Sequence, residues 1–365
     1  MSAGGGDALQ GFQRLQPYLR LAAEKRASDI YFTTGSPAMV RIEGEMHAVG
    51  RQPLKAEEIA AMADAMLSDA QRDALKRERS VDLATHAGGL GRFRANIFHQ
   101  RGDIAMVMRF VGADIPSIEA LGLPAILSDL AMQRRGLVLV VGATGCGKST
   151  SLAAMVDHRN RTAKGHILTI EDPIEYVHSH QRAIVNQREV GLDVPDYESA
   201  LVAAMREAPD VVLIGEVRMH ATMQACLHLA NTGHLTLSTL HANNAHQALQ
   251  RIVNLYPADL RPQLYLDLGL TLRAIVSQRL IQGVDGHRVA ACEVLLNTPY
   301  VSELVTAGRI DEVYDALESS RDRGMQSFDH ALATLYREGR ISEEEALNNA
   351  DSRANLEAKL HFGGS

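Results

Sequence analysis

The sequence predicts an α/β protein with two domains, a small α+β domain followed by a larger domain built on a parallel sheet. Two observations support this prediction. Up to about residue 111, stretches that alternate between apolar and polar residues are separated by glycines, which is typical of strands joined by turns. Beyond about residue 123, apolar strands alternate with helical stretches, which is typical of a parallel sheet with crossover helices.

In the small domain, the spacing of apolar residues predicts helices and strands in turn. Leu15–Lys25 and about Ala56–Leu67 have helical spacing, and the chain between them alternates like a strand. Three more strands are expected after the second helix, joined at Gly88-Gly89 and at Gly102-Asp103. These elements together predict a small α+β domain that ends near Val111.

In the large domain, four apolar segments are predicted as strands of the parallel sheet: Leu137–Val141, His166–Ile170, Val211–Gly215 and Leu235–Thr239. From about Thr298 the chain becomes helix-rich and polar. The expected divisions of the chain are a flexible N-terminus (1–12), the small domain (13–111), a linker (112–122), the large domain with its helical C-terminal part (123–354) and a tail (355–365).

Composition excludes several function classes. The 365 residues include 37 Lys and Arg against 44 Asp and Glu, with 4% aromatic residues and no Trp, which counts against a nucleic-acid channel. The three cysteines lie far apart, which argues against a zinc site or a disulfide framework and favours a reducing, cytoplasmic environment. No apolar run approaches the ~18 residues that a membrane span needs. We therefore expect no direct membrane insertion.

A glycine-rich loop follows the first strand of the large domain. The stretch LVLVVGATGCGKSTSLAAM fits the pattern G-x-x-x-x-G-K-[ST] between a strand and a helix. In such a P-loop, backbone N–H groups point at phosphate oxygens, the lysine neutralises the β- and γ-phosphates, and the following hydroxyl reaches Mg²⁺. We therefore predict ATP as ligand, Ser149 as a magnesium ligand, and the phosphate-binding residues Gly142, Ala143, Thr144, Gly145, Cys146, Gly147, Lys148, Ser149 and Thr150.

Acidic residues follow two other strands of the predicted sheet. HILTIEDPIEY places Glu171, Asp172 and Glu175 just beyond a strand, where they would position Mg²⁺ or an attacking water, although a solvated acidic turn explains them equally well. PDVVLIGEVR brings Glu216 to another strand end. Because Gly215 stands where a Walker B motif usually has Asp, Glu216 is predicted to serve the magnesium ion or the water.

Two histidines and one cysteine complete the candidate site. TGHLTLSTLHANN places His234 and His241 at either end of a strand, where they either pack as ordinary core or surface residues or sense the γ-phosphate. Cys146 lies among the P-loop N–H groups beside Lys148, so we expect its thiolate to be favoured and its alkylation to block ATP binding. The alternative is an inert small residue.

Six segments carry a resemblance to a known family: GATGCGKSTSLAAM, HILTIEDPIEYVH, NQREVG, PDVVLIGEVR, TGHLTLSTLHANNA and GMQSFDHAL. They resemble the retraction ATPases of type IV pili in the secretion-ATPase superfamily, over Leu19–Asp351. Within this group the chain looks PilU-type, because it has DHRNR and ADSR segments and YVSELVTAG replaces the AIRNLIRE of PilT-type members. The resemblance implies a RecA-like ATPase domain preceded by a PAS-like domain.

The resemblance also implies roles for individual residues. Glu171–Glu175 corresponds to an Asp box in which Glu175 is the catalytic glutamate, Glu216 to the Walker B glutamate, and His234 and His241 to a His box. Arginines of the small domain are implied to reach the nucleotide, and two others have no defined role, although any of the five is equally well a surface or ion-pair residue. The first set is Arg92, Arg94 and Arg101, and the second is Arg206 and Arg218. Arg92 and Arg94 alternate on one predicted strand and Arg101 is expected at the start of the next, so we expect the three guanidinium groups to gather on one surface of the small domain.

The predicted function is a Mg²⁺-dependent ATPase that drives or assists pilus retraction. The resemblance implies a cytoplasmic hexamer at the inner-membrane face of the pilus machine, with a PilT-like ATPase and an inner-membrane platform protein as partners. A PilT-type primary retraction motor is the alternative within the family. Two other classes remain open at this point, a RecA-like nucleic-acid translocase and an adaptor that binds ATP with little turnover. The net charge of −7 disfavours the translocase, and the two glutamates disfavour the adaptor.

Overall fold

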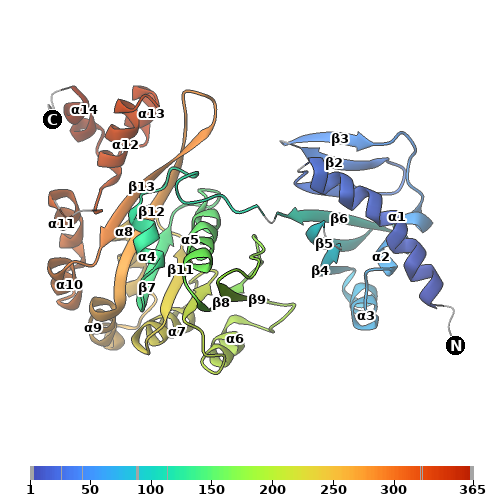
Figure 1. Ribbon diagram of the computed structural model, residues 1–365, viewed down its shortest axis with the longest axis horizontal. Coiled ribbons are helices and arrows are strands. Elements are labelled where there is room, and N and C mark those ends of the chain that lie inside the picture. The colour runs from blue at the N-terminus through green and yellow to red at the C-terminus, as the bar shows by residue number, and fades with distance from the viewer. Residues whose placement is uncertain are drawn as a thin grey trace. The chain divides into compact units, whose positions relative to one another are not determined.

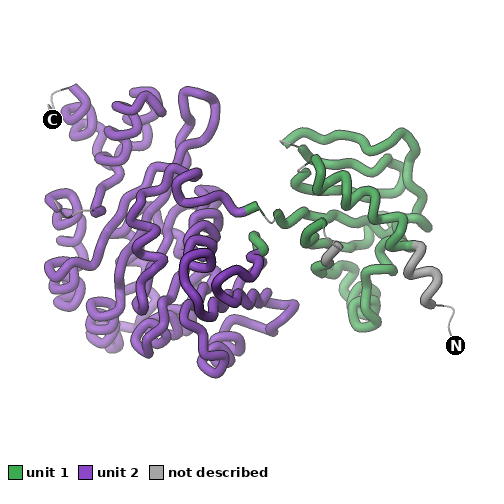
Figure 2. The backbone as a smooth tube through the Cα atoms, in the orientation of Figure 1, with its two compact units in different colours: residues 1–114, 175–177 green, residues 115–174, 178–365 purple. Residues whose placement is uncertain are grey.

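The protein folds into two compact units (Figure 2). The structure, a computed structural model, describes residues 4–25, 27–42, 44–87, 90–112, 114–320, 322 and 324–361, without the side chains of residues 4–10, 86 and 87. Unit 1 extends to Asp114 and includes the short segment Glu175–Val177, and unit 2 comprises Ile115–Ile174 and the chain from His178 onward. The division between Asp114 and Ile115 falls within the predicted linker.

Unit 1 is built on a six-stranded sheet in the order β3-β2-β1-β6-β5-β4, and all neighbouring pairs are antiparallel (Figure 1). Its core joins Leu15 and Leu19 of one helix and Ile59 of another to the sheet residues Phe32 and Phe93. The elements are α1 (Gly4–Lys25), β1 (Asp29–Phe32), β2 (Ala38–Ile42), β3 (Glu45–Val49), α2 (Ala56–Asp64), α3 (Asp69–Glu78), β4 (Ser80–Ala87), β5 (Gly91–Gln100) and β6 (Asp103–Val111).

Unit 2 contains a seven-stranded sheet in the order β13-β12-β7-β11-β10-β8-β9. Neighbouring strands are parallel except at one edge, where β13 runs antiparallel to β12. The strands are β7 (Gly136–Val141), β8 (Gly165–Glu171), β9 (Ala183–Glu189), β10 (Val211–Ile214), β11 (Leu235–Leu240), β12 (Leu272–Gln282) and β13 (Arg288–Leu296). The carboxyl ends of β8, β10, β11 and β7 therefore lie side by side along one edge of the sheet.

Helices cover both faces of this sheet. They are α4 (Ile126–Ala131), α5 (Lys148–Thr162), α6 (Tyr197–Ala204), α7 (His220–Asn231), α8 (Ala245–Asn254), α9 (Arg261–Thr271), α10 (Pro299–Thr306), α11 (Val313–Ser319), α12 (Phe328–Arg337), α13 (Glu343–Asn348) and α14 (Arg353–His361). Short 3₁₀ turns at Ala258–Leu260 and Ile310–Glu312 precede α9 and α11. No helix among the described residues is long and apolar enough to cross a bilayer.

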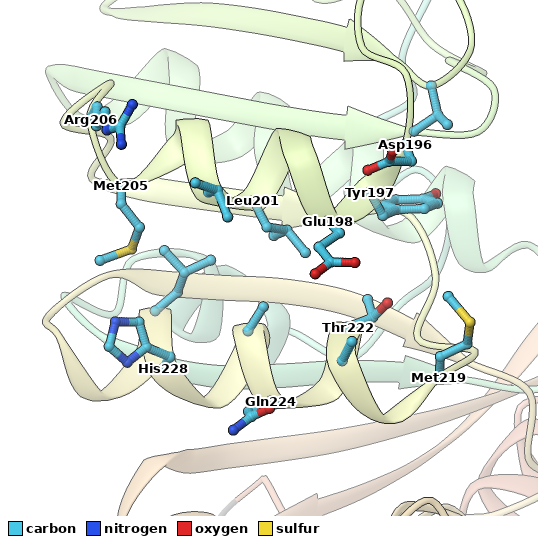
Figure 3. A pocket seen from close by; sticks show the side chains of 15 residues that line it. Asp196, Tyr197, Glu198, Leu201, Met205, Arg206, Met219, Thr222, Gln224 and His228 are labelled. Atoms are coloured by element: carbon cyan, nitrogen blue, oxygen red, sulfur yellow. The ribbon is translucent and has the colours of Figure 1, made fainter.

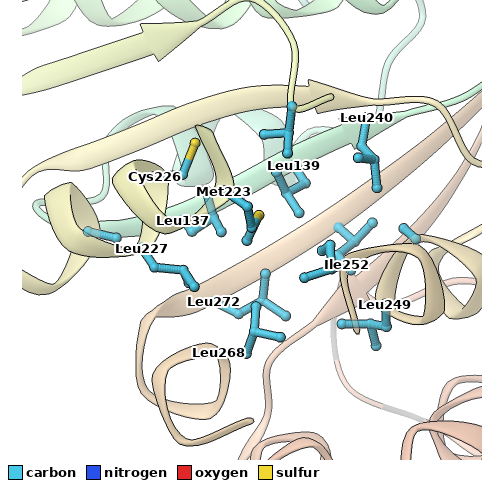
Figure 4. Close-up of a cluster of buried hydrophobic side chains, with 14 of the residues drawn as sticks. Leu137, Leu139, Met223, Cys226, Leu227, Leu240, Leu249, Ile252, Leu268 and Leu272 are labelled. Carbon is cyan, nitrogen blue, oxygen red and sulfur yellow. The ribbon is translucent and has the colours of Figure 1, made fainter. Parts of the chain in front are cut away.

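Alternate residues of the central strand β7 anchor two separate cores. Leu137 and Leu139 pack with α7, α8 and α9, whereas Val138 and Val140 pack on the other face with α4 and α5. Figure 4 shows the first cluster, in which side chains from all three helices converge on β7: Met223, Leu227, Leu249, Ile252 and Leu268. All six residues of β7 are buried, so the strand that leads into the glycine-rich loop is fixed on both faces.

The predicted fold class is confirmed, and the four predicted strands of the large domain correspond to β7, β8, β10 and β11. Strands β9, β12 and β13 were absent from the prediction. Strand β9 alternates between buried and exposed residues, a signal that the sequence analysis did not use. Strands β12 and β13 are buried over most of their length, and periodicity alone does not distinguish such a strand from a buried helix. Helix α3 has only Leu75 buried, so it lacks an apolar stripe, although a capping box between Ser68 and Gln71 marks its start.

The chain ends also differ from the prediction. Residues 4–12, expected to be flexible, are the first half of α1, because a helix whose later turns are anchored by Leu15 and Leu19 propagates at little cost. The predicted tail contains most of α14, which Leu356 anchors by burial. Residues 1–3, Gly88-Gly89 and residues 362–365, to which parts of the prediction apply, lie outside the described residues.

Candidate active site

The glycine-rich loop begins directly after β7 and ends where α5 begins. Three of its glycines have positive φ: 154° at Gly142, 79° at Gly145 and 90° at Gly147. At Gly142 an added Cβ would contact the Cys146 sulfur and would lie 2.6 Å from the carbonyl oxygen of Gln278, and at Gly147 it would lie 2.9 Å from Gln278 Nε2. Both backbone conformation and space therefore require glycine at these two positions.

The loop is also tied to β12. Ser151 Oγ, in the first turn of α5, donates a 2.6 Å hydrogen bond to Gln278 Oε1, and both side chains are buried. Because Gln278 lies on β12 beside the end of β7, this bond fixes the start of α5 against the sheet. The N-terminal end of α5 provides free N–H groups and a positive dipole end, both of which favour a bound phosphate.

A cavity of about 410 Å³ lies at this loop. Lys148 Nζ donates 2.9 Å hydrogen bonds to the carbonyl oxygens of Gly142 and Ala143, so its ammonium lies at the loop mouth. Arg279 and Arg288 also line the cavity, together with Asn243. The donors that surround this cavity are cationic or amide groups, which is the chemistry that binds a nucleotide polyphosphate.

The prediction for the Cys146 thiol is wrong. Lys148 and nearby backbone N–H groups do lower the pKa of this thiol, but burial outweighs them and the net result is a raised pKa. The Cys146 side chain is 6% exposed and contacts the Gly142 position rather than solvent. Cys146 is therefore a protonated packing residue of the loop, and the sequence motif gave no sign of that burial.

Glu171 and Glu216 occupy neighbouring strand ends on the edge of the sheet that also carries the loop. Glu171 is the last residue of β8, and its Oε1 accepts hydrogen bonds from Thr169 Oγ1 at 2.6 Å and Gln187 Nε2 at 3.2 Å. Glu216 follows β10 by two residues. Since β10 is hydrogen-bonded to both β8 and β11, the fold brings these acids together from segments 45 residues apart.

Glu216 lies between a histidine and an arginine. Its Oε1 is 3.2 Å from His241 Nε2, and its Oε2 accepts hydrogen bonds from Arg218 Nε at 2.9 Å and NH2 at 2.8 Å. The pKa of Arg218 is raised, chiefly by the hydrogen bond to Glu216. The Glu216 side chain is 16% exposed, so water reaches it while its orientation is fixed from both sides.

The donor set fits a magnesium ion bound mainly by nucleotide and water. Among the residues that the structure describes, no group of three or more His, Cys, Asp or Glu side chains is arranged to hold a metal. Mg²⁺ usually takes few protein ligands together with phosphate oxygens and several waters. Ser149 and Thr150, half-buried in the first turn of α5, and Glu216, at the same edge of the sheet, match that requirement.

The two predicted histidines are separated by the whole of β11. His241 follows the carboxyl end of β11 and reaches Glu216, whereas His234 precedes its amino end, six strand residues or roughly 20 Å away. His234 Nδ1 lies 3.1 Å from the carbonyl oxygen of Leu229 and 3.2 Å from Thr232 Oγ1. The sequence left open whether these histidines are ordinary packing residues or γ-phosphate sensors, and the structure favours the first for His234, which binds the end of α7.

The arginines of unit 1 do not form one cluster. Arg92 and Arg94 lie on β5 and alternate with the buried Phe93, so they share the other face of the sheet. Arg101 does not begin the next strand but occupies the turn between β5 and β6, with φ of 51°. Because β5 is extended, Arg101 lies roughly 30 Å along the strand from Arg92. The expected gathering of three guanidinium groups is wrong, and their role toward nucleotide stays a prediction.

Two further residues of the prediction are Glu175 and Arg206. Glu175 is exposed and belongs to the segment that is grouped with unit 1, so its catalytic role stays a prediction. Arg206 follows α6 and lines a cavity of about 730 Å³ between α6 and α7, whose wall is mostly apolar (Figure 3). Leu201 from α6, Met205 just after this helix and Met219 before α7 contribute to this wall.

The model of the family described as type II/IV secretion system protein matches residues 11–353 of the chain. The chain belongs to this family. The chain is 47% identical to the type IV pilus ATPase PilU of Pseudomonas aeruginosa, over 94% of this chain and 91% of that protein. It is 37% identical to the type IV pilus retraction ATPase PilT of the same organism, over 91% of this chain and 96% of that protein.

A solved structure supports the same assignment. The crystal structure of the pilus retraction motor PilT with bound ADP is 38% identical to the secretion-family chain and superposes with a TM-score of 0.87, covering 94% of this chain and 98% of that one. The sequence-based assignment to the retraction ATPases is thereby confirmed. The higher identity to PilU than to PilT agrees with the PilU-type segments in the sequence.

Several residues of this secretion-family site were absent from the sequence prediction. Arg279 and Arg288, which line the loop cavity, lie in no sequence motif, and Asn243 lies in the motif TGHLTLSTLHANN but was given no role. Arg279 stacks over Phe328 with 3.8 Å between its guanidinium carbon and the ring centroid, and its NH2 lies 2.5 Å from Asp351 Oδ1. Residues of the C-terminal part therefore fix a cation that lines the candidate nucleotide cavity.

Proposed function

We propose that this chain is an ATP-hydrolysing motor of the type IV pilus machinery that drives or assists pilus retraction, and hence twitching motility. The observation that carries this proposal is the arrangement of the P-loop, His241, Glu216 and Glu171 on four adjacent strand ends of one sheet edge. The similarity to PilU and PilT over almost the whole chain supports the pilus machinery as the setting.

The side chains divide the work of binding and hydrolysis. Lys148 and the N–H groups at the start of α5 bind the phosphates, and Arg279 and Arg288 supply further positive charge at the cavity wall. A bound Mg²⁺, held through Ser149 and Glu216, would neutralise charge on the phosphate oxygens. Glu175 orients the attacking water, and His241 and Arg218 hold Glu216 in place.

The proposed assembly is a hexamer in the cytoplasm, at the inner-membrane face of the pilus machine. As a PilU-type member, the chain would act beside a PilT-like ATPase and an inner-membrane platform protein. A PilT-type primary motor is the alternative, and deleting the gene for a PilT-like neighbour distinguishes them. If retraction stops although this chain is present, its role is accessory, and if retraction continues, it is a primary motor.

Phosphate release by the purified protein tests the enzymatic part of the proposal. We expect Mg²⁺-dependent turnover of ATP that single-stranded DNA leaves unchanged, because the chain has net charge −7 and 4% aromatic residues. Absence of turnover in the correctly assembled protein would leave a nucleotide-switched adaptor. Stimulation by single-stranded DNA would instead favour a translocase.

Mixed assemblies test whether arginines act across a subunit boundary. Since Arg101 lies far along β5 from Arg92 and Arg94, the arginines are changed in two sets, Arg92→Ala with Arg94→Ala, and Arg101→Ala alone. If the arginines of a set act on the ATP site of a neighbouring subunit, their replacement should lower ATP turnover more than it lowers ATP binding. Mixing it with Lys148→Ala subunits should then restore some activity, because some interfaces combine intact arginines with an intact P-loop. Failure to restore activity in confirmed mixed rings would refute the trans arrangement for that set.

A further inference from the structure

Gly215 immediately precedes Glu216 and is glycine for reasons of space. Its φ does not lie in the left-handed region, so backbone conformation does not require glycine there. A Cβ added at this position would lie 2.8 Å from the Tyr197 hydroxyl oxygen and 3.4 Å from Glu171 Cα. The place that a side chain at position 215 would enter is therefore taken by a hydroxyl group from another element.

Tyr197 is held at this point by the start of α6. It is the first residue of that helix, and the preceding Asp196 caps the helix by accepting a 2.7 Å hydrogen bond from Ser199 N–H. The Tyr197 ring is half-buried and packs against the core on the α7 face of the sheet. Figure 3 shows it at the end of α6 opposite to Arg206.

The surroundings of the Tyr197 hydroxyl are acidic. Its pKa is raised, first by burial and then by Asp172, with Glu171 and Glu216 adding to the effect, whereas Arg218 lowers it. The hydroxyl is therefore neutral at physiological pH. The carboxylates that act on this hydroxyl also repel one another, and a neutral group that spaces them adds no cation that would compete with magnesium.

We propose that Tyr197 is a positioning residue for ATP hydrolysis, whose hydroxyl occupies the space left by Gly215 and fixes the separation of Glu171, Asp172 and Glu216. The proposal rests on the proposed function, because it assigns Tyr197 a role in that reaction. It accounts for the departure at the Walker B strand: the usual aspartate is absent, and the space beside Gly215 is taken by the hydroxyl of Tyr197, the first residue of α6.

Tyr197→Phe tests the proposal directly, because it removes only the hydroxyl. We expect kcat to fall about 10-fold and the half-saturating Mg²⁺ concentration to rise several-fold, with KM for ATP within about two-fold of the wild type. The thermal midpoint should change little. Tyr314→Phe, which removes a hydroxyl from α11, is the matched control and should leave all four quantities unchanged. Wild-type kcat and magnesium dependence in Tyr197→Phe would overturn the proposal.

Gly215→Ala provides a second, independent variant. Its methyl group would displace the Tyr197 hydroxyl, so it should reproduce the loss of kcat in the wild-type background. In the Tyr197→Phe background, where no hydroxyl remains to be displaced, the same change should cost little more. Losses that multiply in the double variant would show that the two residues act separately and would overturn the proposal.

Measurements of nucleotide binding distinguish a failure of this proposal from a failure of the proposed function. If the wild-type protein does not turn over ATP, the proposed function fails, and the Mg²⁺ dependence of binding of a non-hydrolysable ATP analogue becomes the test. A several-fold shift between wild type and Tyr197→Phe in that titration supports the positioning role of Tyr197. Identical titrations overturn it.

Discussion

The carboxyl and amino edges of the unit 2 sheet both carry histidines and carboxylates, but these groups make different hydrogen bonds. At the amino edge, Asp210 accepts a 2.8 Å bond from the N–H of His166, and His234 binds the end of α7. At the carboxyl edge, Glu216 is bound by His241 and Arg218, whose side chains come from loops. Polar groups at the amino edge close turns, whereas those at the carboxyl edge bind one another and leave room for a ligand.

The carboxyl edge also places polar groups where they reduce stability. Glu293 on β13 is fully buried beside Ser277, whose Oγ donates to its Oε1 at 2.9 Å, and the N–H of Ala245 donates to the same oxygen at 2.7 Å. Burial raises the pKa of Glu293 to about 7, more than these hydrogen bonds lower it. Ionising Glu293 in the folded state therefore costs free energy, and this buried carboxyl weakens the fold at pH values above its raised pKa.

The largest expected effect comes from replacing a lysine by alanine at each of the two edges. Lys148→Ala removes the ammonium at the loop mouth and should lower ATP turnover by at least about 100-fold. Lys164→Ala, which removes an exposed lysine just before β8 at the amino edge, should leave turnover unchanged. Phosphate release and thermal unfolding of both variants check this. Near-normal turnover by folded Lys148→Ala would contradict the assignment of the P-loop.

Glutamine variants compare Glu216, at the carboxyl edge, with Glu175. Glu175→Gln should bind ATP with magnesium normally but hydrolyse it about 100-fold more slowly, because it loses the carboxylate that we propose orients the water. Glu216→Gln should also weaken the magnesium dependence of ATP binding, because it loses a charged oxygen held by His241 and Arg218. Identical magnesium titrations for the two variants would refute this division of roles.

A pH series tests the cost of polar groups at the carboxyl edge. Because the folded-state pKa of Glu293 is raised from 4.5 to about 7, its contribution to stability is lost as the pH rises through that window. Glu293→Gln should therefore be more stable than the wild type at pH 8 by about 2–3 kcal/mol and similar to it at pH 4.5. Chemical denaturation at both pH values checks this, and an equal difference at both would contradict the raised pKa.

The two histidines give the sharpest contrast between edges. His241→Ala should lower kcat about 10-fold with little change in stability, because Glu216 loses one of the groups that orient it. His234→Ala should leave kcat unchanged and lower the free energy of unfolding by about 1 kcal/mol, the value of a lost hydrogen bond. If His234→Ala lowered kcat as much as His241→Ala does, the functional difference between the edges would not hold.

The smallest effect concerns the accessibility of Cys146. Its burial and raised pKa predict alkylation about 10-fold slower than that of an exposed thiol, with bound ATP slowing it further. Complete modification should block ATP binding, because the loop has no space beside Gly142 for a larger group. Mass spectrometry of the Cys146 peptide measures the rate. Rapid alkylation, or full activity after it, would contradict this account.

Local sequence was sufficient to predict functional groups that lie close together along the chain. The P-loop could be read directly, because its glycines, Lys148 and the hydroxyls after it lie within nine residues and are flanked by a strand and a helix. The strand ends that carry Glu171 and Glu216 were predicted for the same reason. An apolar run followed by a carboxylate specifies the end of a buried strand wherever that strand lies in the sheet.

The tertiary structure decided which of these groups meet. The strand order β7-β11-β10-β8 brings His241 and Glu216 together and leaves His234 at the opposite edge. The burial of Cys146 depends on β12, and the meeting of Tyr197 with Gly215 depends on how α6 crosses the sheet. Hydrophobic periodicity records which face of an element is buried but not which element covers it. Contacts between distant segments, and the pKa values that follow from them, are therefore fixed only when the whole sheet has formed.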